Sequence, residues 1–433
     1  MVGNPPYVRQ ERIRDLKPLL KQTFPEVYAG TADLYVYFYA QGVRILREQG
    51  TLAYISSNKF MRAGYGKKLR RFLGAQTSLH TVIDFGDLPV FDATAYPVIV
   101  ITRKRTSGPE DTLLALSVDS LDVLQRLPLV VHDLAWPMPQ RALRPEGWAL
   151  ERPEVLALME KLRGKGTPLE KYIDGKFYRG VVTGYNPAFV IDEATRQRLI
   201  EEDPYSAEVI KPWLRGKDIK RWRVDWDGLY VIAIQNSGDT DASNPWASAR
   251  SEEEARSIFQ RTYPAVHDYL TQHESALRKR QDQGQFWWEL RACAYYSAFE
   301  KPKIVYPDIA KHSKFVYDQK GFFGGNTLYF VPTDKLFLLA ILNSTVVEFF
   351  YARISASIRG AYLRFFTHYV SQIPIPDTRL QQRDIMNASV AKLLDAQGNG
   401  PQVAAWERAL NEIVYGLYEL TDEEIALVEV ETT

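Results

Sequence analysis

Short apolar segments of strand length alternate with segments of helical periodicity near the N-terminus. Residues 51–56, 81–85 and 96–102 are rich in β-branched and aromatic residues, and each is long enough for one strand. Residues 33–46 and 65–73 carry apolar side chains at roughly helical spacing. Because strands and helices alternate along the chain, this part of the sequence predicts an α/β sheet.

The remaining residues divide into three further regions. Residues 107–166 are rich in proline and charge, and they predict a connector with some structure of its own. Residues 167–378 mix strand-like and helical runs, which is typical of a separate α+β domain. Residues 379–433 predict a helical tail with an amphipathic stretch at 409–420. The expected order is therefore an α/β sheet over residues 1–106, the connector, the α+β domain and the tail.

Composition excludes several classes of protein. The 54 basic and 53 acidic residues give a formal net charge of +1, so any affinity for nucleic acid must come from local clusters of charge. The only cysteine, Cys293, cannot form an intramolecular disulfide or a cysteine-rich zinc site. A reducing, cytoplasmic setting fits this composition best. The six histidines show no metal-ligand spacing, so we expect no metal site.

No segment reads as a signal peptide or a membrane span. The N-terminus lacks both a basic start and an apolar core. Residues 336–351 are the most apolar later stretch, but they include Asn343, Ser344 and Glu348 and are too short to cross a bilayer. We expect a single buried helix there and no contact with a membrane.

The motif that is predicted to carry chemistry is Asn4-Pro5-Pro6-Tyr7, which follows Val2-Gly3. It resembles the signature loop of the amino-methyltransferases that modify adenine at N6. An isolated tetrapeptide of this kind also fits a polyproline-like turn. Further motifs of the family follow in its order, and they argue against that alternative: Asp33-Leu34-Tyr35, Ser56-Ser57-Asn58-Lys59-Phe60, Asp84-Phe85-Gly86 and Val90-Phe91.

The resemblance implies a role for each residue of the loop. The amino group of adenine is a poor nucleophile, because its lone pair is delocalised into the ring. The side-chain oxygen of Asn4 and the backbone carbonyl of Pro5 would accept hydrogen bonds from this amine and direct its lone pair at a methyl donor. Pro5 and Pro6 stiffen the loop. The base would be flipped out of the duplex and held between Tyr7 and Phe91; the alternative for Phe91 is an ordinary core position.

The second half of the chain resembles the Taq-type C-terminal specificity domain. Its matching stretches occur in order at residues 180–189, 210–219, 288–291, 302–306, 342–344 and 373–376. A protein that reads duplex DNA needs cations for phosphates and planar side chains for base edges. Arg215, Lys217, Arg221 and Arg359 are therefore the predicted DNA contacts, although surface arginines are often only solvated. The same two alternatives hold for the basic cluster Lys67, Lys68, Arg70 and Arg71.

Together these resemblances cover nearly the whole chain. They imply the C-terminal half of a Rossmann-like methyltransferase sheet over residues 1–106 and a target-recognition domain over residues 167–378. The implied activity is that of a site-specific adenine-N6 DNA methyltransferase of a type II or IIG restriction-modification system. The methyl donor would be S-adenosylmethionine, and the partner double-stranded DNA.

In the family, the glycine-rich turn that cradles the cofactor precedes the Asn-Pro-Pro-Tyr loop. We therefore expect an N-terminally truncated member that has little cofactor affinity and no activity by itself. An N-terminal methyltransferase half supplied in trans would complete it. The alternative is a non-catalytic DNA-binding specificity module. The acid and lysine order of a nuclease centre is not met.

Overall fold

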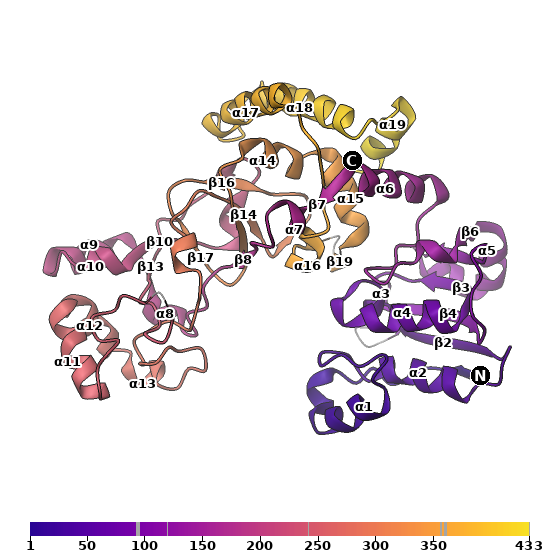
Figure 1. Cartoon of the computed structure of the whole chain (residues 1–433), viewed down its shortest axis with the longest axis horizontal. Helices are drawn as coiled ribbons and strands as arrows, with labels where there is room; N and C mark the ends of the chain where they lie inside the picture. The colour runs from indigo at the N-terminus through magenta and orange to yellow at the C-terminus, as the bar shows by residue number, and fades with distance from the viewer. Residues whose placement is uncertain (92–95, 119, 241, 356, 359–361, 433) are drawn as a thin grey trace. The chain divides into compact units, whose positions relative to one another are not determined.

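The computed structural model describes residues 1–91, 96–118, 120–240, 242–355, 357–358 and 362–432 (Figure 1). The chain divides into two compact units. Unit 1 comprises Met1–Gly164 and Phe349–Leu363, and unit 2 comprises Lys165–Glu348 and Arg364–Thr433. Each unit has its own sheets and its own apolar core.

Unit 1 is built on one six-stranded sheet. Its strands are β1 (Val2–Gly3), β2 (Thr51–Ser57), β3 (Ser78–Asp84), β4 (Pro97–Arg103), β5 (Thr112–Ser117) and β6 (Trp136–Pro139). Their order is β1-β2-β4-β3-β5-β6. β1, β2, β3 and β5 point the same way, whereas β4 is inserted antiparallel between β2 and β3, and β6 is antiparallel to β5. The predicted α/β class and its three N-terminal strands are confirmed.

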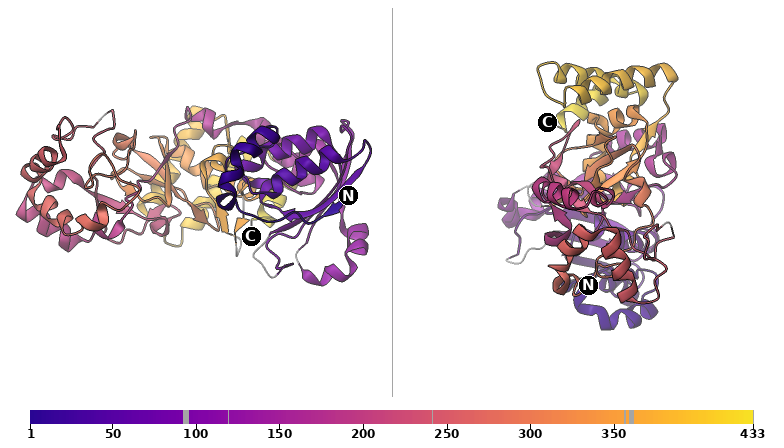
Figure 2. Two further views of the ribbon diagram at one scale, coloured as in Figure 1. Left: turned by 90° about the horizontal axis from the view of Figure 1, so that it is seen from below. Right: turned by 90° about the vertical axis from the view of Figure 1, so that its left-hand side faces the viewer.

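Helices pack on both faces of this sheet (Figure 2). Successive residues of a strand point to opposite faces, so Val82 and Ile83 of β3 belong to two different apolar clusters. The first cluster includes residues of α2 (Tyr35–Ile45) and α4 (Lys67–Gln76), which are the two helices predicted in this region. The second includes residues of α5 (Leu127–Leu134). Both faces therefore contribute to the core.

Shorter helices complete unit 1. They are η1 (Gln10–Leu16), α1 (Lys17–Thr23), α3 (Lys59–Arg62), η2 (Gly64–Gly66), η3 (Leu121–Arg126), η4 (Gln140–Ala142) and α6 (Pro153–Lys165). The predicted connector, residues 107–166, contributes β5 and β6 to the six-stranded sheet. The functional boundaries assigned from the sequence stay predictions.

Unit 2 is an α+β body. One of its four-stranded sheets has the order β17-β10-β13-β9, and another has the order β16-β14-β18-β8. Two-stranded pairs β11-β12 and β21-β7 accompany them. The bounds of the strands from β7 to β21 are as follows: β7 (Gly166–Pro168), β8 (Tyr178–Arg179), β9 (Val190–Ile191), β10 (Ile210–Leu214), β11 (Ile219–Lys220), β12 (Arg223–Val224), β13 (Tyr230–Ile232), β14 (Lys303–Pro307), β15 (Ile309–Ala310), β16 (Val316–Asp318), β17 (Phe323–Gly324), β18 (Leu328–Pro332), β19 (Ser357–Ile358), β20 (Tyr362–Arg364) and β21 (Pro374–Pro376).

The helices of unit 2 include those predicted from periodicity. Residues 252–280 hold α11 (Glu252–Thr262), α12 (Pro264–Thr271) and α13 (Glu274–Leu277). The C-terminal residues form α17 (Leu380–Asp395), α18 (Val403–Leu417) and α19 (Asp422–Val430), as predicted (Figure 1). The others are α7 (Leu169–Tyr172), α8 (Asn186–Phe189), α9 (Glu193–Glu202), α10 (Ser206–Val209), η5 (Gly216–Asp218), η6 (Tyr296–Ala298) and α16 (Thr367–Val370).

The apolar segment at residues 336–351 is not the single helix that was predicted. It forms α14 (Leu336–Leu342) and the start of α15 (Thr345–Ile354), which are bent by 59° relative to each other. The break lies at Asn343, whose Nδ2 donates to the Phe315 carbonyl (2.8 Å) and whose Oδ1 accepts from the Phe315 amide (3.0 Å). The side-chain amide of Asn343 thus pairs with backbone outside the helix, and α14 ends just before this residue. The predicted burial is confirmed, since α14 is buried from Phe337 to Leu342.

No single helix among the described residues has the length and apolar composition needed to cross a bilayer. α14 and α15 reach that length and composition only when the bent pair is counted together.

Candidate active site

The motifs of the N-terminal region meet at one edge of the unit 1 sheet. β1, β2 and β3 are parallel, so the residues that follow them, Asn4, Asn58 and Phe85, lie at the same edge. β4 runs the other way, so Tyr96, which precedes it, lies at this edge too. In open α/β sheets ligands bind outside the carboxyl ends of the strands. This edge is therefore the candidate active site.

The Asn4–Tyr7 loop presents two acceptors that have no hydrogen-bond donor among the described residues. Asn4 is exposed, Pro5 is buried and Pro6 is exposed. The Pro6 carbonyl accepts a hydrogen bond from the Val8 amide at 3.0 Å. Among the described residues, no donor reaches the Asn4 side-chain oxygen or the Pro5 carbonyl. These are the two oxygens that the sequence resemblance implicates.

Tyr7 and Phe91 come together although the sequence separates them widely. Both are half-buried, their ring centroids are 6.2 Å apart and their planes are tilted by 56°. A purine stacked on both rings needs about 7 Å between them, which is two contact distances. The rings must therefore separate and turn before a base can lie between them. The Tyr7 hydroxyl is buried without a partner among the described residues, and burial raises the pKa of Tyr7, so this side chain stays neutral.

Two hydrogen bonds tie the segment after Tyr7 to the start of α2. The Gln10 amide donates to Asp33 Oδ1 at 2.9 Å, and the Leu34 amide donates to the Val8 carbonyl at 3.0 Å. Burial raises the pKa of Asp33, and the bond from Gln10 opposes this shift. The Asp33-Leu34 pair is thus a clamp on the candidate catalytic loop.

This clamp gives a matched pair of variants. We expect Asp33→Ala to lower the activity of the candidate loop by about tenfold, because it removes one loop hydrogen bond of about 1 kcal/mol and leaves the Gln10 amide unpaired. Asp33→Asn keeps an acceptor oxygen and should stay within about twofold of the parent. Since burial raises the pKa of Asp33, the parent loses stability as pH rises from the carboxyl's unfolded pKa to its folded pKa. Thermal melts against pH should show this loss in the parent and a smaller one in Asp33→Asn.

A second clamp fixes the loop that carries Phe91. Asn58 Nδ2 donates to Asp84 Oδ1 at 2.7 Å, and the Gly86 amide donates to the same oxygen at 3.0 Å. The Asn58 amide donates to the Tyr96 carbonyl at 2.6 Å. Gly86 has a φ of +55°, a conformation that glycine adopts without strain. Asn58 and Asp84 are therefore positioning residues, which sequence reasoning placed in separate motifs without joining them.

Three of the predicted DNA-contact residues are engaged within unit 2. Arg215 binds Asp218 (Nε to Oδ2, 3.1 Å) and Asp227, and its bond with Asp218 raises the pKa of Arg215. Lys217 Nζ lies 3.1 Å from Asp227 Oδ2. Arg221 donates to the Asn343 carbonyl. These side chains are already paired in the free protein, and their contacts with DNA stay predictions.

The remaining basic residues singled out in the sequence differ in their exposure to solvent. Arg359 lies outside the described residues. Arg70 is buried and donates to the carbonyls of Pro145 (2.7 Å) and Ala63 (3.0 Å), so the interpretation of Arg70 as a surface cation is wrong. Its guanidinium joins α4 to the segment before it at Ala63 and to the loop at Pro145, and it is withheld from solvent. Lys68 and Arg71 are exposed.

Comparison with known proteins agrees with this arrangement. Residues 1–91 match the family model described as Eco57I restriction-modification methylase, and residues 211–375 match the TaqI-like C-terminal specificity domain. The chain carries both of these parts. Its matches are therefore to an Eco57I-type methylase and a TaqI-like specificity domain, and its relatives are type II methyltransferases, in agreement with the resemblance seen in the sequence motifs.

Curated relatives and a solved structure extend the match over nearly the full chain. The type II methyltransferase M.BstVI of Geobacillus stearothermophilus is 27% identical over 457 residues, which cover 99% of this chain and 74% of the relative. M.XhoI of Xanthomonas vasicola is 27% identical over 447 residues, covering 99% and 76%. The type IIL restriction-modification enzyme MmeI has a TM-score of 0.63 at 13% identity; the match covers 99% of this chain and 56% of MmeI, and it shows a shared fold.

Proposed function

We propose that this type II methyltransferase chain provides the catalytic loop and the recognition region of an adenine-N6 DNA methyltransferase in a restriction-modification system. The observation that carries the proposal is a pair of acceptors, Asn4 Oδ1 and the Pro5 carbonyl, that no described residue donates to, on the loop that also holds Tyr7 next to Phe91. An exocyclic amine has two hydrogens, and this loop offers one acceptor for each.

The proposed chemistry follows from the loop. An adenine flipped out of the duplex stacks on Tyr7, and Phe91 closes on its other face. The two acceptors take the amine hydrogens, so the nitrogen lone pair leaves conjugation with the ring. S-adenosylmethionine, the donor that the relatives imply, supplies an electrophilic methyl group when bound. The amine nitrogen forms a new C–N bond to this methyl group while the methyl C–S bond breaks, and the sulfur keeps the electron pair and leaves as the neutral thioether S-adenosylhomocysteine. The nitrogen afterwards releases one proton to water, so no general base is needed.

The two acceptor oxygens of Asn4 and Pro5 are the feature of this chain that fits a methyl donor. Two oxygens that strengthen a nitrogen nucleophile are useful only where an electrophilic carbon is brought to that nitrogen. No residue of this chain is assigned to the cofactor. Unit 2 supplies recognition of double-stranded DNA in this proposal, supported by its TaqI-like specificity domain and by a fold neighbour solved in complex with DNA.

The proposal is tested by locating methyl groups in DNA. The chain is expressed in a methylation-free bacterial host, alone and together with a separate cofactor-binding methyltransferase segment, and the genome is sequenced by a method that reads modified bases. N6-methyladenine at one recurring sequence in either culture supports the proposal. Specific DNA binding without methylation in both would instead favour a recognition module, and methylcytosine would contradict the assignment to adenine.

Tyr7 gives a second prediction. We expect Tyr7→Ala to weaken capture of a flipped base by about tenfold to a hundredfold, since stacking of a base on an aromatic ring is worth about 1–3 kcal/mol. Tyr7→Phe keeps the ring and removes a hydroxyl that has no described partner, so it should stay within about twofold. The measurement is the fluorescence of 2-aminopurine at the target position, which rises when this base leaves the stack. Equal fluorescence in the alanine variant and the parent would remove Tyr7 from base stacking.

A further inference from the structure

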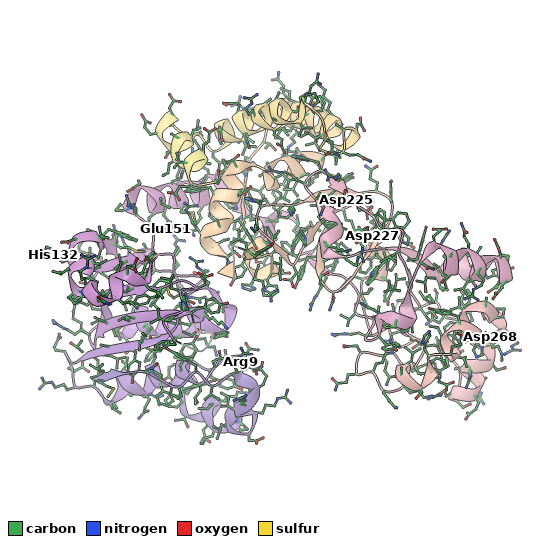
Figure 3. The ribbon with its side chains drawn as sticks, turned by 180° about the vertical axis from the view of Figure 1, so that it is seen from behind. Arg9, His132, Glu151, Asp225, Asp227 and Asp268 are labelled. Carbon is green, nitrogen blue, oxygen red and sulfur yellow. The ribbon has the colours of Figure 1, made fainter. Side chains whose placement is uncertain are left out.

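Two arginines lie next to the candidate catalytic loop. Tyr7, Val8, Arg9, Glu11 and Arg12 line a hollow of about 630 Å³ in unit 1. Both arginines are exposed, and Arg9 is visible at the surface of this unit (Figure 3). The hollow adjoins the aromatic ring on which the target base is proposed to stack.

Neither guanidinium is paired within the described residues. Arg9 and Arg12 make no side-chain hydrogen bond and no ion pair there. The nearby carboxylates already have partners, because Glu11 Oε1 accepts from Gln10 Nε2 (2.7 Å) and Asp33 Oδ1 accepts from the Gln10 amide (2.9 Å). Arg9 acts on both carboxylates only through space. In contrast, Arg215 of unit 2 is bound by two aspartates.

The backbone that carries these arginines is held in place. The Val8 carbonyl accepts from the Leu34 amide, and the Gln10 amide is bound to Asp33, so Arg9 lies between two fixed residues. The Arg12 amide donates to the Arg9 carbonyl at 3.0 Å, which joins the two arginines in one turn. The turn therefore carries both arginines of the hollow, and neither side chain makes a hydrogen bond or ion pair within the described residues.

We infer that Arg9 and Arg12 form a phosphodiester subsite that holds the target strand on either side of the flipped nucleotide. This inference rests on the proposed function. The phosphates flanking a flipped base are covalently linked to it, so they must lie close to the ring that holds the base. A guanidinium binds phosphate oxygens through two parallel N–H groups, and an unpaired one does so without first breaking an internal ion pair.

The test uses the full chain and a duplex that contains the methylated sequence. The Arg9→Gln and Arg12→Gln double variant is compared with Arg14→Gln, an exposed arginine of the same helix that does not line the hollow. We expect the double variant to bind about a hundredfold more weakly, at about tenfold for each charged contact. The slope of log affinity against log salt should fall by about two, because each lost phosphate contact removes about 0.9. Arg14→Gln should change neither quantity appreciably.

A modified duplex identifies the phosphates. When the phosphates flanking the target adenine are replaced by neutral methylphosphonates, the parent should lose affinity and the double variant should lose almost none. Additive losses of affinity would overturn the inference. A double variant that binds DNA as tightly as Arg14→Gln would also overturn it. The proposed function is judged separately, by whether the parent methylates adenine. Circular dichroism checks that each variant is folded.

Discussion

Asn4→Ala should lower the rate of methyl transfer to DNA by about a hundredfold to a thousandfold, the usual effect of removing one preorganised polar group from a reacting centre. Asn4 is exposed at the end of β1, and no described residue donates to its side-chain oxygen, so the substitution breaks no internal contact. The loss therefore belongs to the chemical step. Single-turnover transfer of a labelled methyl group measures it, in a preparation that methylates adenine with the parent chain.

Two controls separate this effect from misfolding and from weak binding. Asn4→Asp keeps an acceptor oxygen at the same place, so it should retain more activity than the alanine variant. Affinity for DNA should stay within about twofold in both, because the proposed role of Asn4 begins only when the amine is in place. An alanine variant with the parent's single-turnover rate would remove Asn4 from the mechanism.

The residues of the loop could be predicted because they are contiguous and chemically specific. Asn4, Pro5 and Tyr7 form a rare combination, and the ordered motifs after them led to Phe91. Their meeting with Phe91 depends on two loops at one sheet edge, which parallel strands impose. The predicted strand positions followed from short β-branched runs, and the structure confirms them in β2, β3 and β4.

Contacts between distant residues could not be predicted in this way. Asn58 follows β2 and Asp84 ends β3, and these two strands are not neighbours, because β4 lies between them in the sheet. A basic run in the sequence gives no sign of which side chain turns inward, so buried Arg70 looked like its exposed neighbours. Likewise, one side-chain amide at Asn343 divides an apolar run into two helices through a partner far away in the sequence.

The sequence also does not show which basic side chains are paired with carboxylates in the fold. Arg215 belongs to a basic turn and has the appearance of a DNA contact, yet the fold places Asp218 and Asp227 against it. Arg9 follows the candidate catalytic motif and is not among the DNA contacts predicted from the sequence, although its guanidinium has no ion-pair partner among the described residues. Tertiary structure decides which basic side chains remain available to bind DNA. A carboxylate that lies close in space can neutralise such a side chain even when it is distant in the sequence.

Unit 2 depends on one fully buried carboxylate. Glu289 has no exposed surface. Its Oε1 accepts from Trp246 Nε1 at 2.8 Å, from Ser237 Oγ and from Asn244 Nδ2 at 3.4 Å, while Oε2 accepts from the Phe286 amide at 3.1 Å. A buried acceptor shared by several donors is costly to remove, because each donor then loses its partner away from water.

We therefore expect Glu289→Ala to destabilise unit 2 by about 4 kcal/mol or more, at roughly 1–3 kcal/mol for each donor left unpaired. This is a large part of the 5–15 kcal/mol that typically stabilises a domain, so the melting temperature should fall by about 10 °C or more. Tryptophan fluorescence reports the transition, because Trp246 is buried next to the carboxylate. Glu300→Ala is the matched control, since Glu300 forms a half-exposed ion pair with Lys211 whose loss should cost less than about 1 kcal/mol. If Glu289→Ala had the same melting temperature as Glu300→Ala, the buried donors would have found other hydrogen-bond partners.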